Sequence, residues 1–202
     1  AALGFGVGPV VLSRPGGASA ASPKVACPGR WTTATLLWQL FHPDEGALEQ
    51  RPFHEIIPAL ESGESDLGVC IHEARFTYEA HGLELIEDLG ATWERETGAP
   101  LPLGGIFARR SLGDEQTARV TALIQASLAY GRANPDEALT SMRRYAQEFE
   151  DDVLREHVTL YVNEFTTALG EVGEGALSVL GERARHAGLL KEESAPLEIF
   201  GG

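Results

Sequence analysis

The stretch LGVCIHEARFTYEAHG, residues 67–82, connects the fold class of this chain to its most reactive candidate side chain. Residues 67–71 are apolar without interruption, which is typical of a strand covered on both faces of a parallel sheet. His72 and Glu73 follow at once. In open α/β sheets, ligands bind beyond the carboxyl ends of the strands. The sequence therefore predicts that His72 faces a cleft rather than the core.

Strand-like and helix-like segments alternate around that stretch. Short apolar runs predict strands at residues 8–13, 24–27, 67–71, 82–90 and 105–109. Apolar side chains at helical spacing predict helices at residues 32–41, 53–63, 114–133, 153–165 and 175–187, and Asn134 begins a further one. Strands alternating with helices, followed by a helical tail, are typical of an α/β architecture with parallel strands.

Two segments have the character of crossovers between lobes. Residues 8–14 lead out of one region, and residues 101–113 lead back to it. A compact unit inserted between two such strands is the connection found in a two-lobed, hinged binding fold. We therefore expect residues 1–17 to form part of lobe 1 with the first hinge strand, and residues 18–103 to form lobe 2. Residues 104–202 are expected to form the second hinge strand and the helical part of lobe 1.

The charge of the chain limits its partners. Asp and Glu number 30 against 16 Lys and Arg, which gives a net charge of −14. So negative a surface repels phosphate backbones and anionic lipid, and no apolar run is long enough to span a bilayer. We expect no nucleic-acid partner, no membrane partner and a cytoplasmic location. An anionic small molecule is the expected ligand where local backbone dipoles or an arginine overcome the general field.

The cysteines give a weaker indication. Cys27 and Cys70 are the only two, and their spacing matches no metal site. We interpret them as reduced thiols, as in a reducing compartment.

A first candidate binding element lies in CPGRWTTA, residues 27–34. A predicted strand ends, Pro28 and Gly29 turn the chain, and a helix begins at Thr32, Thr33 and Ala34. The first amides of a helix lack intrahelical acceptors and carry positive partial charge, so they can hold a carboxylate or phosphate oxygen. The alternative is that Thr32 or Thr33 merely caps its own helix.

His72 likewise has two interpretations. An imidazole in a cleft can accept a proton at physiological pH, whereas a structural histidine would simply have its hydrogen bonds satisfied. Zinc is not predicted, because HEARF lacks the second histidine four residues on. Glu73 could orient the ring and Arg75 could meet an acid group, or each is a solvated loop charge.

Other candidates have simpler explanations. GFGVG, residues 4–8, precedes a strand instead of following one, so it predicts close backbone approach rather than a dinucleotide loop. His157 falls on an apolar helical stripe and is interpreted as a core or interface histidine. Tyr161 and Asn163 could reach the cleft, although the periodicity also explains Tyr161 as a core residue.

Five segments together carry a family resemblance. They are ALGFGVGPVV (2–11), PGRWTTA (28–34), IPALESGESDLGVCIHEARFTY (57–78), DLGATWERETGAPLPLGGIFARR (88–110) and HVTLYVNEFTTALGEVGEGAL (157–177). In this order they resemble the 1,4-dihydroxy-6-naphthoate synthase family of the futalosine route to menaquinone. HEARFTY and GRWTTA are the most specific of these motifs, and the resemblance covers nearly the whole chain.

The resemblance implies a fold and an activity. The fold is the two-lobed fold of type II periplasmic binding proteins, adapted to catalysis. The activity is a carbon–carbon lyase reaction that converts cyclic dehypoxanthinyl futalosine to 1,4-dihydroxy-6-naphthoate without metal or organic cofactor. Carried over by residue, the catalytic base falls on His72 and the carboxylate-binding helix start falls on Thr33 and Ala34.

The same resemblance places a further substrate-binding segment in lobe 1, upstream of Ala1. This agrees with a chain that has no initiating Met and enters a strand almost at once, so we expect the N-terminal part of lobe 1 to be missing. The alternatives are chorismate dehydratase of the same pathway, or a non-catalytic protein of this fold that binds a small carboxylate. An oligomer is compatible with the helical tail and the last stretch, residues 191–202.

Overall fold

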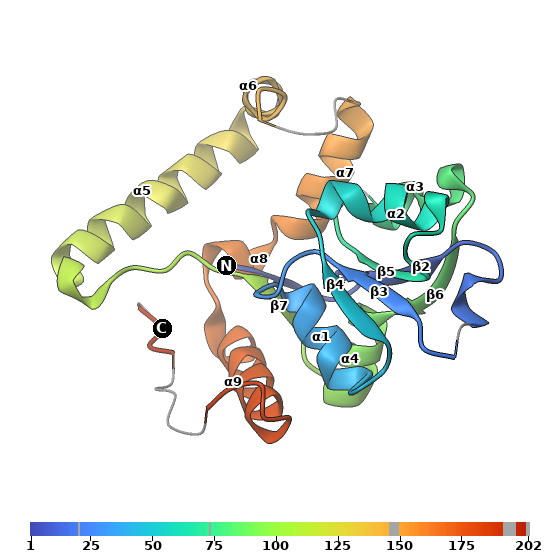
Figure 1. Ribbon diagram of the computed structural model, residues 1–202. Coiled ribbons are helices and arrows are strands. Elements are labelled where there is room, and N and C mark those ends of the chain that lie inside the picture. Colours follow the sequence, from blue (N-terminus) through green and yellow to red (C-terminus); the bar gives the residue numbers. More distant parts are fainter. Residues whose placement is uncertain (20, 73, 146–149, 192–196, 201–202) are drawn as a thin grey trace.

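The computed structural model describes residues 1–19, 21–72, 74–145, 150–191 and 197–200. Figure 1 shows two regions. One is the α/β part, a sheet with helices α1 (Thr33–Phe41), α2 (Ile56–Ser62), α3 (Ala74–Thr77) and α4 (Leu89–Thr97). The other is the helical part, which contains α5 (Asp114–Ala133), α6 (Pro135–Met142), α7 (Asp151–Tyr161), α8 (Glu164–Thr167) and α9 (Gly170–His186). The mixed α/β class predicted from the sequence is confirmed.

The main sheet has five strands in the order β4-β3-β5-β2-β6. They are β2 (Val10–Ser13), β3 (Lys24–Cys27), β4 (Ala47–Gln50), β5 (Leu67–Cys70) and β6 (Glu84–Asp88). β3 runs parallel to β4 and β5, but β2 runs antiparallel to β5 and β6. The prediction of parallel strands is therefore confirmed for β3, β4 and β5 and wrong for the pairs that β2 forms. An uninterrupted apolar run reports burial on both faces, which a central strand has whatever the direction of its neighbours.

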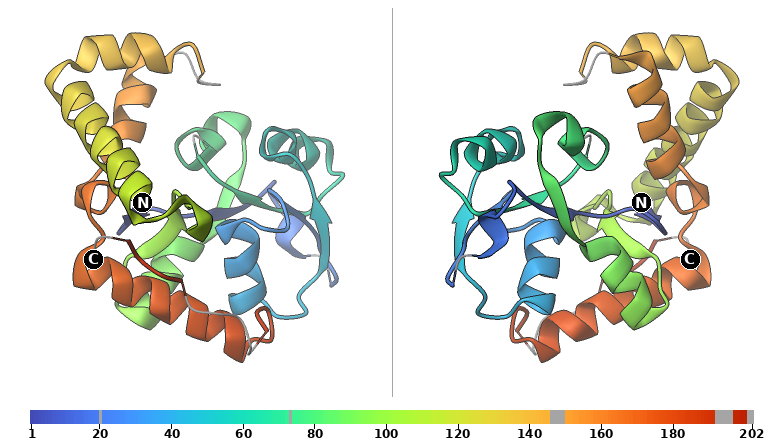
Figure 2. Two further views of the ribbon diagram at one scale, coloured as in Figure 1. Left: turned by 90° about the vertical axis from the view of Figure 1, so that its left-hand side faces the viewer. Right: turned by 90° about the vertical axis from the view of Figure 1, so that its right-hand side faces the viewer.

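Helices cover both faces of this sheet (Figure 2). On one face Val11 and Val25 pack with Leu37 and Trp38 of α1 and with Trp93 of α4. On the other face, Val10 and Leu12 pack with Ile56 and Leu60 of α2. Successive residues of β2 thus serve opposite faces, as the pleat of a strand requires. Each fully buried aliphatic side chain contributes about 1.5–3 kcal/mol of burial free energy, so these two layers hold the α/β part together.

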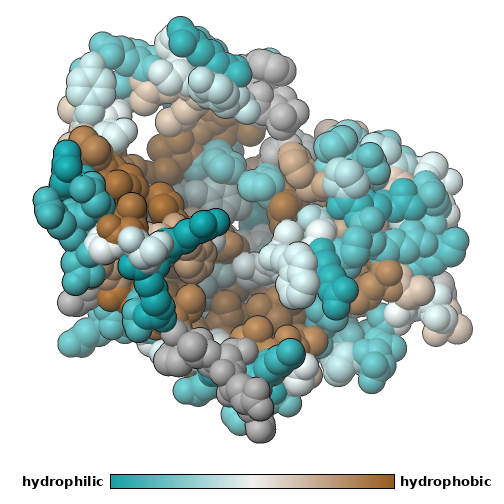
Figure 3. Space-filling model, turned by 60° about the vertical axis from the view of Figure 1, so that its left-hand side comes forward, coloured by the Kyte–Doolittle hydropathy of each residue, from teal (hydrophilic) through white to brown (hydrophobic). Residues whose placement is uncertain are grey.

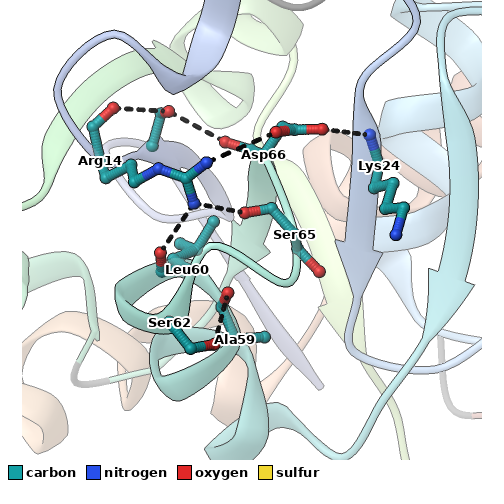
Figure 4. A network of polar contacts seen from close by, with 8 residues as sticks. Arg14, Lys24, Ala59, Leu60, Ser62, Ser65 and Asp66 are labelled. Carbon is teal, nitrogen blue, oxygen red and sulfur yellow. Dashed lines mark hydrogen bonds and ion pairs between the residues drawn. The ribbon is translucent and has the colours of Figure 1, made fainter.

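A network of hydrogen bonds and an ion pair around Arg14 stabilises the edge of the sheet where β3 and β5 begin (Figure 4). The Arg14 guanidinium donates to the carbonyl oxygens of Leu60 at 3.3 Å and Ser65 at 3.4 Å, and lies 3.7 Å from the Asp66 carboxylate. The other oxygen of Asp66 accepts the Lys24 amide at 2.9 Å. One arginine therefore joins the end of β2 to the end of α2 and to the starts of β3 and β5.

A second, two-stranded sheet connects the two regions. It pairs β1 (Ala2–Gly4) with β7 (Leu101–Gly104) in antiparallel register. The chain then passes close to α4: a Cβ added to Gly8 would lie 2.8 Å from the Gly90 Cα, and one added to Gly90 would lie 2.3 Å from the Val7 oxygen. The close backbone approach predicted for GFGVG is confirmed, because only glycine fits on either side of this contact.

Two predicted elements differ from the structure. Residues 105–109 form no strand, since β1, the partner of β7, reaches only Ala2 at that end, and Ile106 and Phe107 remain 76% and 75% exposed. The helix predicted over 153–165 is interrupted: α7 ends at Tyr161, and Asn163 begins α8 with a capping box. Local hydrogen bonding by an asparagine side chain competes with helix continuation and explains the break.

The helical part presents apolar side chains on its surface. No residue of α5 is buried, and Leu123 on this helix is 70% exposed. Figure 3 shows apolar residues lining the hollowed face between this part and the α/β part.

Among the helices that the structure describes, none combines the length and apolar character that a bilayer crossing requires.

Candidate functional site

The candidate site lies at one edge of the main sheet. Because β3 and β5 are parallel neighbours, their carboxyl ends meet at the same edge. The turn into α1 follows β3, and His72 follows β5 after one residue. The sheet topology thus brings the two sequence-predicted elements to the same edge.

At the first element, Thr32 caps α1. It is in extended conformation, and its hydroxyl oxygen accepts the Thr35 amide at 3.2 Å. The capping alternative is therefore correct for Thr32. The amides of Thr33 and Ala34 come next, and neither has an acceptor among the residues that the structure describes. Amides of this kind at the positive end of a helix have the geometry that favours an anion.

The side chains of these two residues have other roles. The Thr33 hydroxyl donates to the backbone of β7, lying 3.2 Å from the Leu103 oxygen and 3.4 Å from the Pro102 oxygen. A hydroxyl has only one proton, so in this arrangement it is not available as a donor to a ligand. Ala34 is 2% exposed, so its methyl group belongs to the core. The groups that could hold an anion here are the main-chain amides.

At the second element, His72 occupies a turn with left-handed backbone, φ 58°. Its side chain is exposed and contacts two aromatic rings. The Phe53 ring, in the short helix before α2, meets it edge-on at 5.4 Å between centroids. The His157 ring of α7 stacks on it at 5.9 Å with 30° between the planes. The imidazole therefore faces the helical part across the edge of the sheet and is not buried among aliphatic side chains.

His157, interpreted from the sequence as a core or interface histidine, lies where the two parts of the molecule meet. Its half-buried ring is between the rings of His72 and Tyr161, with 4.5 Å between the His157 and Tyr161 centroids. The available signal was a titratable residue in an otherwise apolar stripe. Asn163 does not reach the site, because its amide group donates to the Leu3 oxygen at 2.6 Å and its side-chain oxygen caps α8.

Arg75, a charged residue of the HEARF motif, has structural partners in the α/β part. Arg75 forms an ion pair with Asp88 at 2.5 Å and donates to the Gly8 oxygen at 3.3 Å. Its side chain is only 19% exposed, so it is neither a solvated loop charge nor a free anion ligand. Asp88 also caps α4 through the Ala91 amide. Arg75 thus connects Gly8, in the segment between β1 and β2, to the start of α4. Glu73 lies outside the described residues.

A cavity of about 470 Å³ lies elsewhere in the α/β part. It is lined by Trp38, His42, Glu45, Leu67, Ile86 and Glu87, among others, which places it at the amino ends of β3 and β5. His42 lies between two carboxylates there, 3.0 Å from Glu45 and 2.6 Å from Glu87. The cavity is therefore at the opposite edge of the sheet from His72.

The cysteines are buried thiols on opposite faces of the sheet. Cys27 packs in the layer of α1 and Cys70 in the layer of α2, and both are free. Burial raises the pKa of Cys27 to about 11, against a smaller opposing effect of its hydrogen bond with Thr35. Burial, assisted by the charge of Cys27, raises the pKa of Cys70 to about 12. Thiols of this kind are unreactive at neutral pH.

Metal ligands do not gather in the part of the chain that the structure describes. Within those residues, no group of three or more His, Cys, Asp or Glu side chains is arranged to hold a metal ion.

Sequence comparisons give a consistent result. The family described as menaquinone biosynthesis matches residues 1–186. A 1,4-dihydroxy-6-naphthoate synthase of Thermus thermophilus is 44% identical over 198 residues, covering 98% of this chain and 72% of that protein. The protein of that name from Streptomyces coelicolor is 43% identical over 194 residues, covering 94% and 69%.

Structural comparisons agree on the fold. A protein from Archaeoglobus fulgidus superimposes with a TM-score of 0.86 at 33% identity, covering 94% of this chain and 71% of that one. The ligand-binding component of an ABC-type import system from Staphylococcus aureus gives a TM-score of 0.59 at 15% identity, covering 94% and 67%. The periplasmic sulphonate-binding protein of Escherichia coli gives 0.57 at 13%, covering 95% and 70%. These last two show the fold alone, and it is the predicted two-lobed binding-protein fold.

Proposed function

Because the chain belongs to the menaquinone biosynthesis family, we propose that it is a 1,4-dihydroxy-6-naphthoate synthase. Its substrate would be cyclic dehypoxanthinyl futalosine, and the reaction a carbon–carbon lyase cleavage in the cytoplasm. The observation that supports this proposal best is local: an exposed imidazole lies at the same edge of the sheet as two helix-start amides that find no acceptor among the described residues. The curated relatives named above are enzymes of this name.

The first step of the proposed mechanism is binding. The amides of Thr33 and Ala34 receive the substrate carboxylate, whose charge is stabilised by the positive end of α1. The Thr33 hydroxyl takes no part in this contact, because it donates to the backbone of β7. A carboxylate fixed at this point sets the position of the bicycle relative to the end of β5.

The second step is proton removal. The neutral imidazole of His72 takes a proton from a carbon of the sugar-derived ring, and the electron pair of that C–H bond drives cleavage of a neighbouring bond. The products are the aromatic dihydroxynaphthoate and a fragment of the former sugar. Aromatisation provides driving force, so the protein contributes mainly positioning and one base, a factor of about 10² to 10⁴ in rate for the base. Closure of the two parts would exclude water from the intermediate.

A substrate test decides between this function and its nearest alternative. The purified full-length protein is incubated with cyclic dehypoxanthinyl futalosine or with chorismate, and products are separated and identified by mass and absorbance. We expect 1,4-dihydroxy-6-naphthoate from the first substrate and no change in the second. Dehydration of chorismate, or binding of either compound without turnover, would contradict the proposal.

A further inference from the structure

Four aromatic rings form a row that crosses from the α/β part to the helical part. Phe53 contacts His72 at 5.4 Å, His72 contacts His157 at 5.9 Å, and His157 contacts Tyr161 at 4.5 Å. The first two residues belong to the α/β part and the last two to α7. We call these four residues the ring row.

His72 needs an external support for its orientation. It sits at a left-handed position in a turn, and its side chain is exposed to solvent. An exposed imidazole on such a turn samples several rotamers unless neighbouring groups restrict it. The ring contacts that the structure gives it are the Phe53 edge on one part and the His157 face on the other.

His157 is itself well placed to provide that support. It and Tyr161 are four residues apart on α7, so their side chains stack on one face of the helix. Tyr161 also packs against the core layer of α1, which anchors this end of the ring row. His157 is half-buried, in contrast to the exposed His72. Within the ring row, His157 therefore connects the anchored Tyr161 to the exposed His72.

We propose that His157 is a positioning residue whose ring, by stacking on His72, fixes the orientation in which that imidazole removes the substrate proton. This inference rests on the proposed function, since it assigns a role in the same site. The two rings stack with 5.9 Å between centroids and 30° between planes, within the range of offset stacking. In this proposal the ring of His157 is the effective group, and the substitutions below test it against the proton and charge of that residue.

Ring and charge can be separated by two substitutions. His157→Phe keeps a flat ring of similar size and removes every titratable atom, whereas His157→Ala removes the ring. A misdirected base costs up to about a hundredfold in rate. We expect His157→Ala to lower kcat about tenfold to a hundredfold with KM within about threefold, and His157→Phe to keep kcat within about threefold. His186, exposed at the end of α9, is the control: His186→Ala should leave both constants unchanged.

Nuclear magnetic resonance tests the contact without any substrate. The Hε1 signal of His72 is assigned by its loss in His72→Asn, and is then compared between the parent chain, His157→Ala and His157→Phe. We expect a clear displacement in His157→Ala, because a neighbouring ring is removed, and a smaller one in His157→Phe.

Three results would overturn the inference. The first is unchanged kcat in His157→Ala, and the second is an equal loss of kcat in His157→Phe and His157→Ala. The third is a His72 signal that does not respond to His157→Ala. If the parent chain fails to turn over the substrate while the His72 signal still responds, the proposed function is wrong and the orientation of His72 by His157 stands.

Discussion

The hydroxyl of Thr33, on the first residue of α1, donates to the carbonyl oxygen of Leu103 in β7 across 3.2 Å. This contact fastens the start of the helix to the strand that connects the two parts of the molecule. The hydroxyl of Thr33 therefore has a structural partner, whereas its amide is one of the two groups that we propose to hold the substrate carboxylate. The two functions can be tested apart.

Thr33→Val removes the hydroxyl and keeps the amide. We expect a loss of about 1 kcal/mol in the free energy of unfolding, the usual contribution of one hydrogen bond, measured by urea denaturation. Substrate affinity, measured by titration calorimetry, should stay within about threefold, because the hydroxyl donates to β7 and not to the ligand.

Thr33→Pro removes the amide hydrogen as well. Proline is tolerated at the first position of a helix, and the extended backbone of Thr32, φ −96° and ψ 153°, suits a residue that precedes proline. We expect substrate to bind at least about tenfold more weakly than to Thr33→Val, because a hydrogen bond to a charged group is worth about 1.5–3 kcal/mol. Equal affinities of the two variants would show that the Thr33 amide does not hold the carboxylate.

The close contact of Val7 and Gly8 with Gly90 of α4 predicts that two glycine-to-alanine substitutions change the free energy of unfolding in opposite directions. Gly90→Ala would place a methyl group 2.3 Å from the Val7 oxygen, so we expect destabilisation by about 1–3 kcal/mol. Among the described residues, apart from the chain neighbours and nearby backbone of α9 itself, no atom lies within 4 Å of a Cβ added to Gly175 in that helix. Gly175→Ala should therefore stabilise the chain by about 0.5–1 kcal/mol. Denaturation curves of both variants measure this, and a neutral Gly90→Ala would contradict the packing.

The buried thiols predict loss of stability in alkaline solution. In the unfolded chain a thiol ionises around its ordinary pKa of 9.0, whereas in the folded chain the pKa of Cys27 is about 11 and that of Cys70 about 12. Between these values the folded state binds more protons, so the free energy of unfolding falls as pH rises. Their contribution is fully present below pH 9 and is lost progressively above it.

Urea denaturation at pH 8, 9, 10 and 11 measures that slope. The double variant Cys27→Ala/Cys70→Ala is the control, and we expect its stability to decline less steeply over the same range. The parent and the variant will share any decline that comes from other groups. Parallel curves would show that the thiols ionise equally in both states.

The sequence predicted the elements that depend on local patterns. The buried strand predicted over residues 67–71 is β5, which ends at Cys70, and Thr32, one of the two predicted candidates, caps α1. Strand direction was not predictable, because the apolar pattern of β5 is the same beside a parallel or an antiparallel neighbour. β4 was missed since it is a short strand at the edge of the sheet with little buried surface.

The site was predictable only in part, for a similar reason. A helix start and a histidine after a strand are local signals, and sheet topology brings them to one edge. The stacking of His157 on His72 joins residues far apart in the chain, and helical periodicity alone assigns His157 to an apolar stripe. The Arg75–Asp88 ion pair is another such contact. Because of it, Arg75, which the sequence offers as a partner for an acid group, has a structural role.

The most direct test of the account is the separation of turnover from binding in His72→Asn. Asparagine tolerates the left-handed backbone at this position, so the turn is kept while the base is removed. His72→Gly, which also suits φ 58°, is a second variant without the imidazole. For both variants kcat is measured by formation of the naphthoate, and substrate affinity by calorimetry. We predict kcat lower by about 10² to 10⁴ with affinity within about tenfold; turnover close to that of the parent chain, or affinity and kcat lost equally, would contradict the assignment of His72 as the base.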